Sequence, residues 1–405
     1  MKTFFKEIAG LMHEADPDTS FAIEFWDTDT IHFGEKPVFT LHLTSRNAAR
    51  QMMANGFLGF GEAYMAQEVE VDGNLSELLR LGVTINFNQN RLSAFQKLRF
   101  LSIALVNRGT RRKSPKNISF HYDRGNDFYS LYLDESLTYS CAYFKNPDDT
   151  LEQAQANKYE HVCRKLQLKE GESLVDIGCG WGGMLIYAAQ HYGITGEGCT
   201  LSRNQYEYAN QKIKELALQE RLRVYYRDYR EMSGRFDKFV SIGMFEHVGK
   251  KYYQDFFKKT GRLLKKGGLG LLHSIGKDTP SPSDAWTMKY IFPGGFLPTL
   301  SEMAAGAGEA GFSVLDVENL RLHYARTVDC WLENYERNIE KVRAMCDESF
   351  LRRWRLFLAS SAAGFRFSQT RLFQMLFSNG LNNELPMTRE HIYRRKSDTV
   401  ALQEY

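Results

Sequence analysis

A glycine-rich stretch at residues 173–184 (SLVDIGCGWGGM) has the residue types of a nucleotide site. A short apolar run reaches Asp176, Gly178, Gly180 and Gly182 follow, and a helical run begins near residue 185. Glycines permit positive φ and let a ligand approach the backbone, while the first N–H groups of the next helix supply donors. The spacing Asp-x-Gly-x-Gly-x-Gly differs from the dinucleotide and triphosphate fingerprints, so it favours an adenosine-sulfonium cofactor. The alternative is a simple turn between core elements, which four glycines in six positions disfavour.

Further polar residues close predicted strands downstream of this turn. Strands are expected at 198–202, 223–228, 236–243 and 269–276, and helical stretches such as 204–218 and 253–264 separate them. This alternation predicts an α/β fold with a doubly wound, parallel, Rossmann-like sheet. Ligands of such sheets bind at the carboxyl ends of the strands. One crevice should therefore collect five residues that are far apart in sequence: Asp176, Thr200, Asp228, Glu246 and His273.

Eight motifs along the same region resemble those of the cyclopropane-fatty-acyl-phospholipid synthases and the related mycolic acid cyclopropane synthases. The similarity covers about residues 118–380. The motifs are FHYDRGNDFY (120–129), TYSCAYF (138–144), VDIGCGWG (175–182), TLSRNQ (200–205), MFEHVG (244–249), LHSI (272–275), FPGG (292–295) and HYART (323–327).

The resemblance implies a class I S-adenosylmethionine methyltransferase that transfers a methylene group to a cis double bond of an unsaturated phospholipid acyl chain. An alkene needs no base for the attack on a methyl group, but the resulting carbocation must be kept from water and then deprotonated. Such a site should be dry and aromatic and should hold one base. In the family that base is a bicarbonate ion, and the residues that bind it correspond here to Cys141, Glu246, His273, the Ile275 backbone and Tyr324.

The resemblance also assigns residues to the S-adenosylmethionine site. Gly178 and Gly180 should face the cofactor, and Asp228 should accept from the adenine amino group beside Tyr229. Thr200 stands where many methyltransferases have an acid that binds the ribose, so Gln205 is expected to take that role. The other expected contacts are Tyr139, Ser140, Asp176, Cys179 and Leu201. No metal ligands are expected.

Each catalytic candidate also has a structural interpretation. Cys141 could be a small buried hydrophobe, and Glu246 could interact with a helix dipole. His273 lies between leucines and isoleucine, as a core histidine would, and Tyr324 could pack with its hydroxyl bonded to backbone. The functional interpretation depends on the whole set occurring together.

Length and the motif positions divide the 405 residues into two predicted domains. Residues 1–110 are expected to form a small α+β domain, in which GFGEAYM (59–65) resembles the extra domain of the bacterial phospholipid enzymes. Residues 111–405 are expected to form the catalytic domain. The proline- and glycine-rich segment 276–298 is predicted to be a lid, and aromatic-rich helices are predicted around 328–345 and 350–379.

The charge pattern predicts a membrane-surface role. Net charge is only +3, but nine Lys or Arg and no Asp or Glu lie between residues 78 and 122. With interspersed apolar residues at 91–116 this suits an anionic lipid surface. A solvated basic linker is the alternative, and nucleic acid is not expected because no groove-reading or base-stacking motif accompanies the charge.

Composition indicates a globular chain with 43% hydrophobic and 25% charged residues. No apolar run is long enough to cross a bilayer, and residues 1–16 form an amphipathic pattern unlike a signal peptide. The six cysteines lack paired spacing and should be free thiols. We therefore expect a cytoplasmic enzyme, peripheral at the inner membrane surface, and the resemblance suggests a homodimer.

Two other functions remain open from the sequence. One is a methyltransferase that gives a methyl-branched lipid or methylates a small molecule. The other is a non-catalytic lipid-binding protein on the same fold, which the intact glycines and the complete catalytic set disfavour.

Overall fold

The computed structural model describes residues 1–87 and 125–393, which fall into two compact units. Among these residues, the first unit is drawn from Met1–Asn117, Ser281–Gly294 and Ala325–Thr370. The second is drawn from Ile118–Pro280, Gly295–Tyr324 and Arg371–Tyr405. The boundary predicted at residue 110 and the basic stretch at 91–116 lie outside the described residues.

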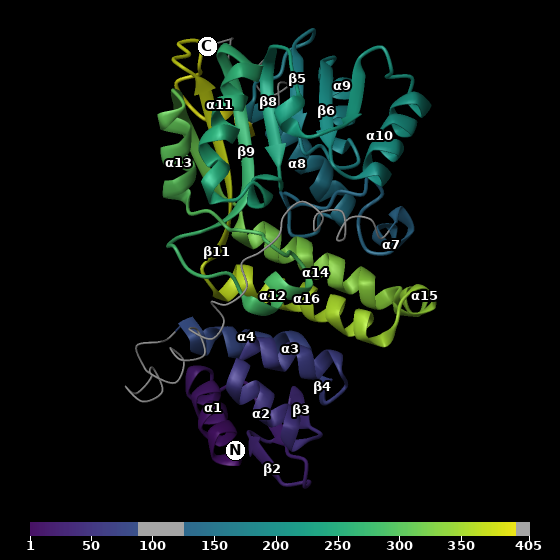
Figure 1. Ribbon diagram of the computed structural model, residues 1–405, viewed down its shortest axis with the longest axis vertical. Helices are drawn as coiled ribbons and strands as arrows, with labels where there is room; N and C mark the ends of the chain where they lie inside the picture. Colours follow the sequence, from purple (N-terminus) through teal and green to yellow (C-terminus); the bar gives the residue numbers. More distant parts are fainter. Residues whose placement is uncertain (88–124, 394–405) are drawn as a thin grey trace, which may run out of the picture. The chain divides into compact units, whose positions relative to one another are not determined.

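A seven-stranded sheet forms the centre of the second unit, with the order β10-β11-β9-β8-β5-β6-β7 (Figure 1). The five strands from β9 to β7 are parallel, and β10 pairs antiparallel with β11. This confirms the predicted α/β methyltransferase-like fold. The strand bounds are β5 (Ser173–Ile177), β6 (Thr195–Thr200), β7 (Leu222–Tyr226), β8 (Phe236–Ile242), β9 (Leu264–Lys277), β10 (Phe312–Asn319) and β11 (Thr370–Asn379).

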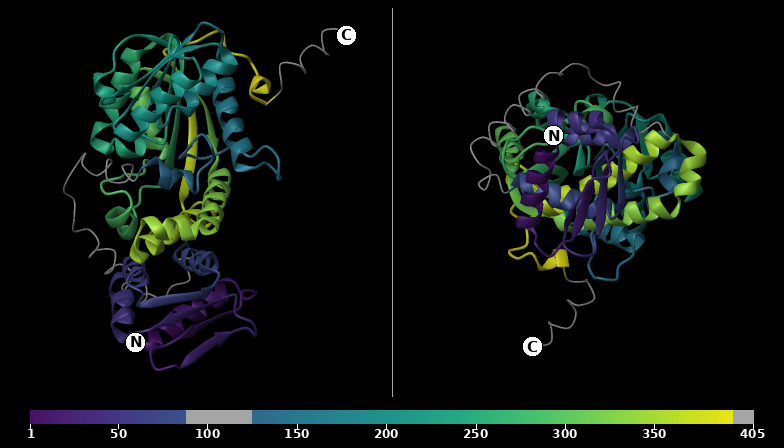
Figure 2. Two further views of the ribbon diagram at one scale, coloured as in Figure 1. Left: turned by 90° about the vertical axis from the view of Figure 1, so that its right-hand side faces the viewer. Right: turned by 90° about the horizontal axis from the view of Figure 1, so that it is seen from below.

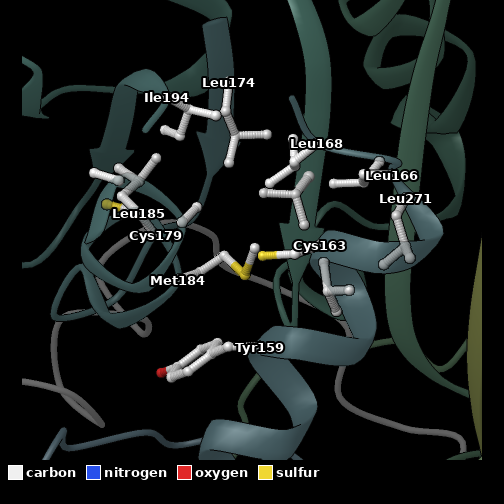
Figure 3. Close-up of a cluster of buried hydrophobic side chains, with 14 of the residues drawn as sticks. Tyr159, Cys163, Leu166, Leu168, Leu174, Cys179, Met184, Leu185, Ile194 and Leu271 are labelled. Atoms are coloured by element: carbon white, nitrogen blue, oxygen red, sulfur yellow. The ribbon is translucent and has the colours of Figure 1, made fainter. Parts of the chain in front are cut away.

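Helices cover both faces of this sheet. Buried side chains of α8 (Leu151–Lys165), α9 (Gly183–Tyr192) and α10 (Arg203–Glu215) share one apolar cluster with the sheet, which Figure 3 shows around Tyr159, Met184 and Leu271. Side chains of α11 (Tyr253–Leu263) and α13 (Leu300–Glu309) form the cluster on the other face. The short elements of the unit are α7 (Asn126–Ser130), η2 (Tyr229–Glu231), η3 (Phe245–His247), η4 (Lys250–Tyr252) and α17 (Glu390–Tyr393).

Local caps fix where the helices around the sheet begin. Thr150 and Gln153 form a capping box at the start of α8, which places its buried face against the sheet. The Ser202 hydroxyl accepts from the Gln205 N–H at the start of α10. These caps satisfy N–H groups that would otherwise lack partners.

The predicted helix at 350–379 is wrong in its second half. Helix α16 (Glu348–Phe367) ends near Ser368, whose hydroxyl bonds back to the Gly364 carbonyl, and residues 370–379 form β11 instead. Every β11 residue from Leu372 to Asn379 is buried. A continuous apolar run fits a buried strand as well as a buried helix, so periodicity could not separate them. Strand β10 was also not predicted.

The first unit contains a four-stranded sheet of order β2-β1-β3-β4, whose strands are visible in the left view of Figure 2. Its strands are β1 (Phe21–Glu24), β2 (Thr30–Phe33), β3 (Phe39–Leu43) and β4 (Val69–Gly73). Its helices are α1 (Lys2–Ala15), α2 (Arg46–Asn55), α3 (Phe57–Met65), α4 (Leu75–Phe87), α12 (Ala285–Tyr290), most of α14 (Arg321–Arg337), α15 (Ile339–Met345) and α16.

Helix α12 lies inside the segment predicted to be a lid. Its Trp286 is fully buried and lies 5.9 Å from the Phe57 ring, so the centre of this segment packs within the first unit. A lid role for 276–298 stays a prediction.

None of the helices in the described ranges is long and apolar enough to cross a membrane. All six cysteines are free, as expected, and four of them are buried.

Arg352 joins α16 to the N-terminal sheet within the first unit. Its guanidinium is buried, donates to the carbonyls of Tyr64 and Val69 and to Glu70, and lies 4.1 Å from the Tyr64 ring centre. The planar guanidinium directs its donors toward three acceptors in a fixed geometry, so less side-chain freedom is lost per hydrogen bond than with a lysine.

We predict that Arg352→Met lowers the free energy of unfolding by about 2–3 kcal/mol, because two buried carbonyls lose their donor. Urea denaturation measures this. Arg343→Met is the matched control: that arginine is half exposed on α15 and pairs with Glu340, so its loss should cost less than about 1 kcal/mol. Equal effects of the two substitutions would contradict the anchoring role.

Candidate active site

The glycine turn after β5 has the geometry of a ligand-binding backbone. Gly178, Gly180 and Gly182 have φ of 80°, 57° and 87°. The N–H groups of Gly178 and Cys179 donate to the Cys199 carbonyl at 3.0 and 3.1 Å, which fixes the turn against β6. A Cβ on Gly178 would lie 2.7 Å from the Met244 Cβ, so only glycine fits there.

Asp176 lies at the end of β5 beneath this turn and is fully buried. Burial raises the pKa of its carboxyl to about 7, and the Lys158 charge only partly opposes this. Its Oδ1 has no hydrogen-bond partner among the described residues. A buried carboxylate oxygen without a partner is costly, which fits a cationic or donor-rich ligand at the turn.

Tyr139 and Ser140 precede Cys141 on a buried loop. The Ser140 hydroxyl accepts from Lys158 Nζ at 3.0 Å, and the Tyr139 ring lies 5.5 Å from Tyr129. Lys158 is buried on α8, and burial lowers its pKa to about 8 although Asp134, Cys141 and Asp176 oppose the shift. The sequence analysis did not identify Lys158, which interacts with both the cofactor and the catalytic candidates.

At the end of β6, Thr200 and Gln205 bind each other. The Thr200 hydroxyl donates to Gln205 Oε1 at 2.6 Å and accepts from the Ser202 N–H at 3.1 Å. With its oxygen held by Thr200, Gln205 presents its amide nitrogen as the donor. Leu201 is 41% exposed at the same strand end and can provide an apolar wall.

Asp228 follows β7 and caps η2. Burial opposes ionisation of its carboxyl, but hydrogen bonds from the Arg230 side chain and backbone outweigh burial and keep its pKa below the ordinary value. Asp228 is therefore an ionised acceptor. The Tyr229 ring beside it packs edge-on to Phe256, 5.6 Å between centres.

The catalytic candidates lie around a second, apolar cluster. Cys141 and two leucines are buried there, and Ile275, Tyr324 and Tyr143 pack against them. The Cys141 thiol lies 3.2 Å from the Ala142 carbonyl, which accepts its hydrogen. Tyr143 is stacked between the rings of His161 and His323, at 4.2 and 4.7 Å.

Glu246 on η3 is tied to this cluster through the backbone. The Ile275 N–H donates to its Oε1 at 2.5 Å, whereas Oε2 is buried and has no partner in the described part of the chain. Burial raises the pKa of the carboxyl to about 7, although hydrogen bonds from the Glu246 and Ile275 backbone and from the Ser274 side chain oppose the shift. Glu246 can therefore hold a proton near neutral pH.

His273 lies on β9 level with Ile242, the last residue of β8. Its Nδ1 lies 3.1 Å from Gln374 Nε2, and its Nε2 is buried without a partner among the described residues. Burial lowers its pKa well below the ordinary value, so the ring is neutral. Residues two apart on a strand share a face, which places His273 beside Ile275.

The structure thus brings Cys141, Glu246, His273, Ile275 and Tyr324 to one region and arranges the cofactor candidates along the ends of β5, β6 and β7. Lys158 interacts with both Asp176 and Cys141, so the two groups adjoin. The sequence analysis missed Lys158, Lys165 and Gln374. Lys158 and Lys165 are seven residues apart and therefore share one face of α8. This spacing was the signal for the two lysines that the sequence offered.

Comparison with known proteins identifies the family. A family model described as mycolic acid cyclopropane synthetase matches residues 109–375, and a model of a domain of unknown function, DUF7884, matches residues 10–91. The chain belongs to the mycolic acid cyclopropane synthetase family.

Individual relatives extend this family assignment to most of the chain. The "Probable fatty acid methyltransferase" of Pseudomonas putida is 36% identical, with 92% of this chain and 96% of that protein covered. The cyclopropane-fatty-acyl-phospholipid synthase of Escherichia coli K12 is 37% identical, with 84% and 88% covered. This family member is an S-adenosylmethionine-dependent methyltransferase.

A solved structure shares the fold of about two thirds of the chain. The mycolic acid cyclopropane synthase CmaA1 complexed with SAH and CTAB superposes with a TM-score of 0.62 at 33% identity, covering 66% of this chain and 99% of that one. The positive-φ glycines, the unpartnered Asp176 oxygen and the ionised Asp228 give this chain a site that fits S-adenosylmethionine.

We predict a pH-dependent stability difference for Glu246→Gln. Because the folded-state pKa of Glu246 is above the unfolded value of 4.5, the wild type binds extra protons and loses stability as pH rises from 4.5 to about 7. Glutamine does not titrate. The free energy of unfolding of the variant relative to wild type should therefore rise by about 3 kcal/mol across that window, at about 1.4 kcal/mol per pH unit.

Urea denaturation at pH 5 and pH 8 measures this difference. Glu220→Gln, a change at an exposed glutamate of the same unit, controls for the loss of one charge. A difference between Glu246→Gln and wild type that is the same at both pH values would show that Glu246 ionises normally in the folded protein.

Proposed function

We propose that this enzyme transfers a methylene group from S-adenosylmethionine to the cis double bond of unsaturated phospholipid acyl chains, with bicarbonate as the base. The observation that carries the proposal is that His273 Nε2 and Glu246 Oε2 are buried and unpartnered within the described ranges, on residues that adjoin Ile275 of the apolar cluster: Glu246 accepts from the Ile275 N–H, and His273 lies two residues before it on β9. The relatives named for fatty acid and cyclopropane chemistry support a lipid substrate.

The residues at the carboxyl ends of β5, β6 and β7 would hold the cofactor. Bound S-adenosylmethionine supplies an electrophilic methyl group. The turn at Gly178 and Gly180 gives close backbone approach, Gln205 offers an amide donor, and Asp228 offers an ionised acceptor. Asp176 provides a buried carboxyl oxygen, Oδ1, to which no described residue donates a hydrogen bond.

Ring formation requires that one proton leave the transferred carbon. His273 Nδ1 faces the Gln374 amide and the Cys141 thiol is buried, so neither is placed to take that proton, whereas Glu246, with a pKa of about 7, can exchange one near neutral pH. A small anion held by the neutral imidazole and the protonated carboxyl would fill this role. Glu246 can share its proton with the anion, which avoids repulsion between two negative charges.

The surroundings suit a cationic reaction intermediate on the acyl chain. Cys141, Leu320 and Leu372 are buried, and Tyr143 and Tyr324 pack against them. Apolar walls exclude water, and aromatic faces stabilise positive charge.

The remaining parts of the proposal come from the sequence and the resemblance. They are docking of the basic stretch 91–116 on an anionic membrane surface, a cytoplasmic and peripheral location, and a homodimer. The docking stretch lies outside the described residues.

A second candidate function is transfer that leaves a methyl branch instead of a ring. The P. putida relative named as a probable fatty acid methyltransferase favours it, as does the sphingolipid C9-methyltransferase of Komagataella phaffii, 31% identical over 80% of this chain. The two functions share the cofactor site and differ in the fate of the proton.

Product analysis separates these functions. Purified enzyme with S-adenosylmethionine and vesicles of one defined cis-unsaturated phospholipid should yield acyl chains that gain one CH₂ group and resist mild hydrogenation. Glu246→Gln should lose most of this product but retain cofactor binding, because glutamine cannot hold the proton that organises the anion. A reducible methylated chain would favour branching, and unchanged phospholipids with the wild type would contradict the proposal.

A further inference from the structure

A chain of hydrogen bonds leads from β10 to His273 through the interior of the second unit. Glu318 Oε2 accepts from Lys165 Nζ at 2.6 Å, and Lys165 Nζ donates to Gln374 Oε1 at 2.8 Å. Gln374 Nε2 then lies 3.1 Å from His273 Nδ1. The lysine, the glutamine and the histidine are each 1% exposed, so water does not substitute for these bonds.

Lys165 determines which way the Gln374 amide points. An ammonium group has three donors and no acceptor, so the Gln374 atom facing Nζ must be the carbonyl oxygen. The amide nitrogen must then face His273. This orientation follows from the chemistry of lysine and does not depend on telling oxygen from nitrogen in the amide.

The amide in turn determines the tautomer of His273. An amide N–H only donates, so Nδ1 must be the acceptor and cannot carry the proton. A neutral imidazole then carries its proton on Nε2. That nitrogen is buried and has no partner among the described residues.

Lys165 is itself held in place by charge. The Glu318 carboxylate also accepts from His161 Nε2 at 2.6 Å. Burial opposes ionisation of Glu318, but the hydrogen bond from His161 and the charge of Lys165 outweigh it and lower its pKa to about 2. The ionised carboxylate keeps the buried ammonium paired.

We propose that Lys165, acting through Gln374, is a positioning residue that holds His273 as the Nε2–H tautomer and so presents a hydrogen-bond donor to an acceptor atom of a ligand. The inference rests on the proposed function only for the identity of that ligand, a bicarbonate-like anion. Lys165 and Gln374 do not touch the reacting atoms in this role. They make the imidazole a donor where the other tautomer would offer a lone pair and repel an anion.

The wild-type protein gives the first test. In ¹⁵N spectra of histidine-labelled enzyme, assigned by the loss of signals in His273→Asn, His273 should show a protonated Nε2 and an unprotonated Nδ1. A proton on Nδ1, or an even mixture of tautomers, would overturn the proposal. This readout needs neither substrate nor turnover, so it stands apart from the proposed function.

Gln374→Glu gives the second test. A carboxylate has the shape of the amide but no N–H, so it would accept from both Lys165 and His273, and Nδ1 should gain a proton. Turnover should fall about 10- to 100-fold, the loss seen when the partner that orients a metal-ligating histidine is changed. An unprotonated Nδ1 in this variant, or unchanged turnover despite a shifted proton, would count against the positioning role.

Lys165→Met tests whether the lysine is what orients the Gln374 amide and so fixes the His273 tautomer. Lys238→Met is its matched control. Lys238 is also buried and pairs with a glutamate, Glu172 at 3.5 Å, but it takes no part in the hydrogen-bond chain that leads to His273. Lys165→Met should give mixed His273 tautomers with a similar loss of turnover, whereas Lys238→Met should leave the His273 signals unchanged. If His273 remained a single Nε2–H tautomer in Lys165→Met, the lysine would not determine the orientation of the Gln374 amide.

Discussion

Burying a charged or polar group without a partner is costly, and this cost governs how the buried polar side chains of the second unit are arranged. Lys158, Lys165 and Asp176 are all essentially inaccessible to water, although large apolar clusters pack against the sheet on both faces. Most such groups are satisfied: Lys165 binds Glu318 and Gln374, and Lys158 binds Ser140. Among the candidate site residues, three buried atoms have no partner within the described ranges, namely Asp176 Oδ1, Glu246 Oε2 and His273 Nε2; other buried atoms without one, such as Gln155 Oε1 and Gln167 Nε2, belong to residues outside the candidate set. In a well-packed protein, such exceptions mark where a ligand completes the structure.

The site has two halves with complementary chemistry. The cofactor half consists of the candidates at the ends of β5, β6 and β7, and the catalytic half consists of the candidates around Cys141. Asp228 is ionised, and the Lys158 charge favours the ionised form of Asp176, so both suit the donor and cationic groups of the cofactor. The neutral His273 donor and Glu246, whose raised pKa has no cation opposing it, suit an anion. Lys158 interacts with Asp176 in the cofactor half and with Cys141 in the catalytic half. The site can therefore hold a cation and an anion near each other while the cluster around Cys141 stays apolar.

The sequence predicted the parallel strands and the polar residues at their ends well. An apolar run followed by glycine or a short polar residue is typical of a buried strand that ends in a turn. The sequence could not place β11, since an apolar run such as LFQMLF at 372–377 suits a buried helix equally. The seven-residue spacing of Lys158 and Lys165 placed both on one helix face but could not show that this face is buried, because a lysine on an amphipathic helix usually faces solvent. The burial of Lys165 depends on Glu318 and Gln374, which lie more than 150 residues away in sequence and approach only in the folded sheet.

The central claim is that the unpartnered donors at His273 and Glu246 hold an anion that the reaction requires. Turnover of S-adenosylmethionine to S-adenosylhomocysteine, measured with unsaturated phospholipid vesicles in buffer freed of carbon dioxide and then with bicarbonate restored, tests it most directly. The account predicts a rate that falls on removal and recovers on addition of bicarbonate. A rate that is unchanged throughout would contradict it.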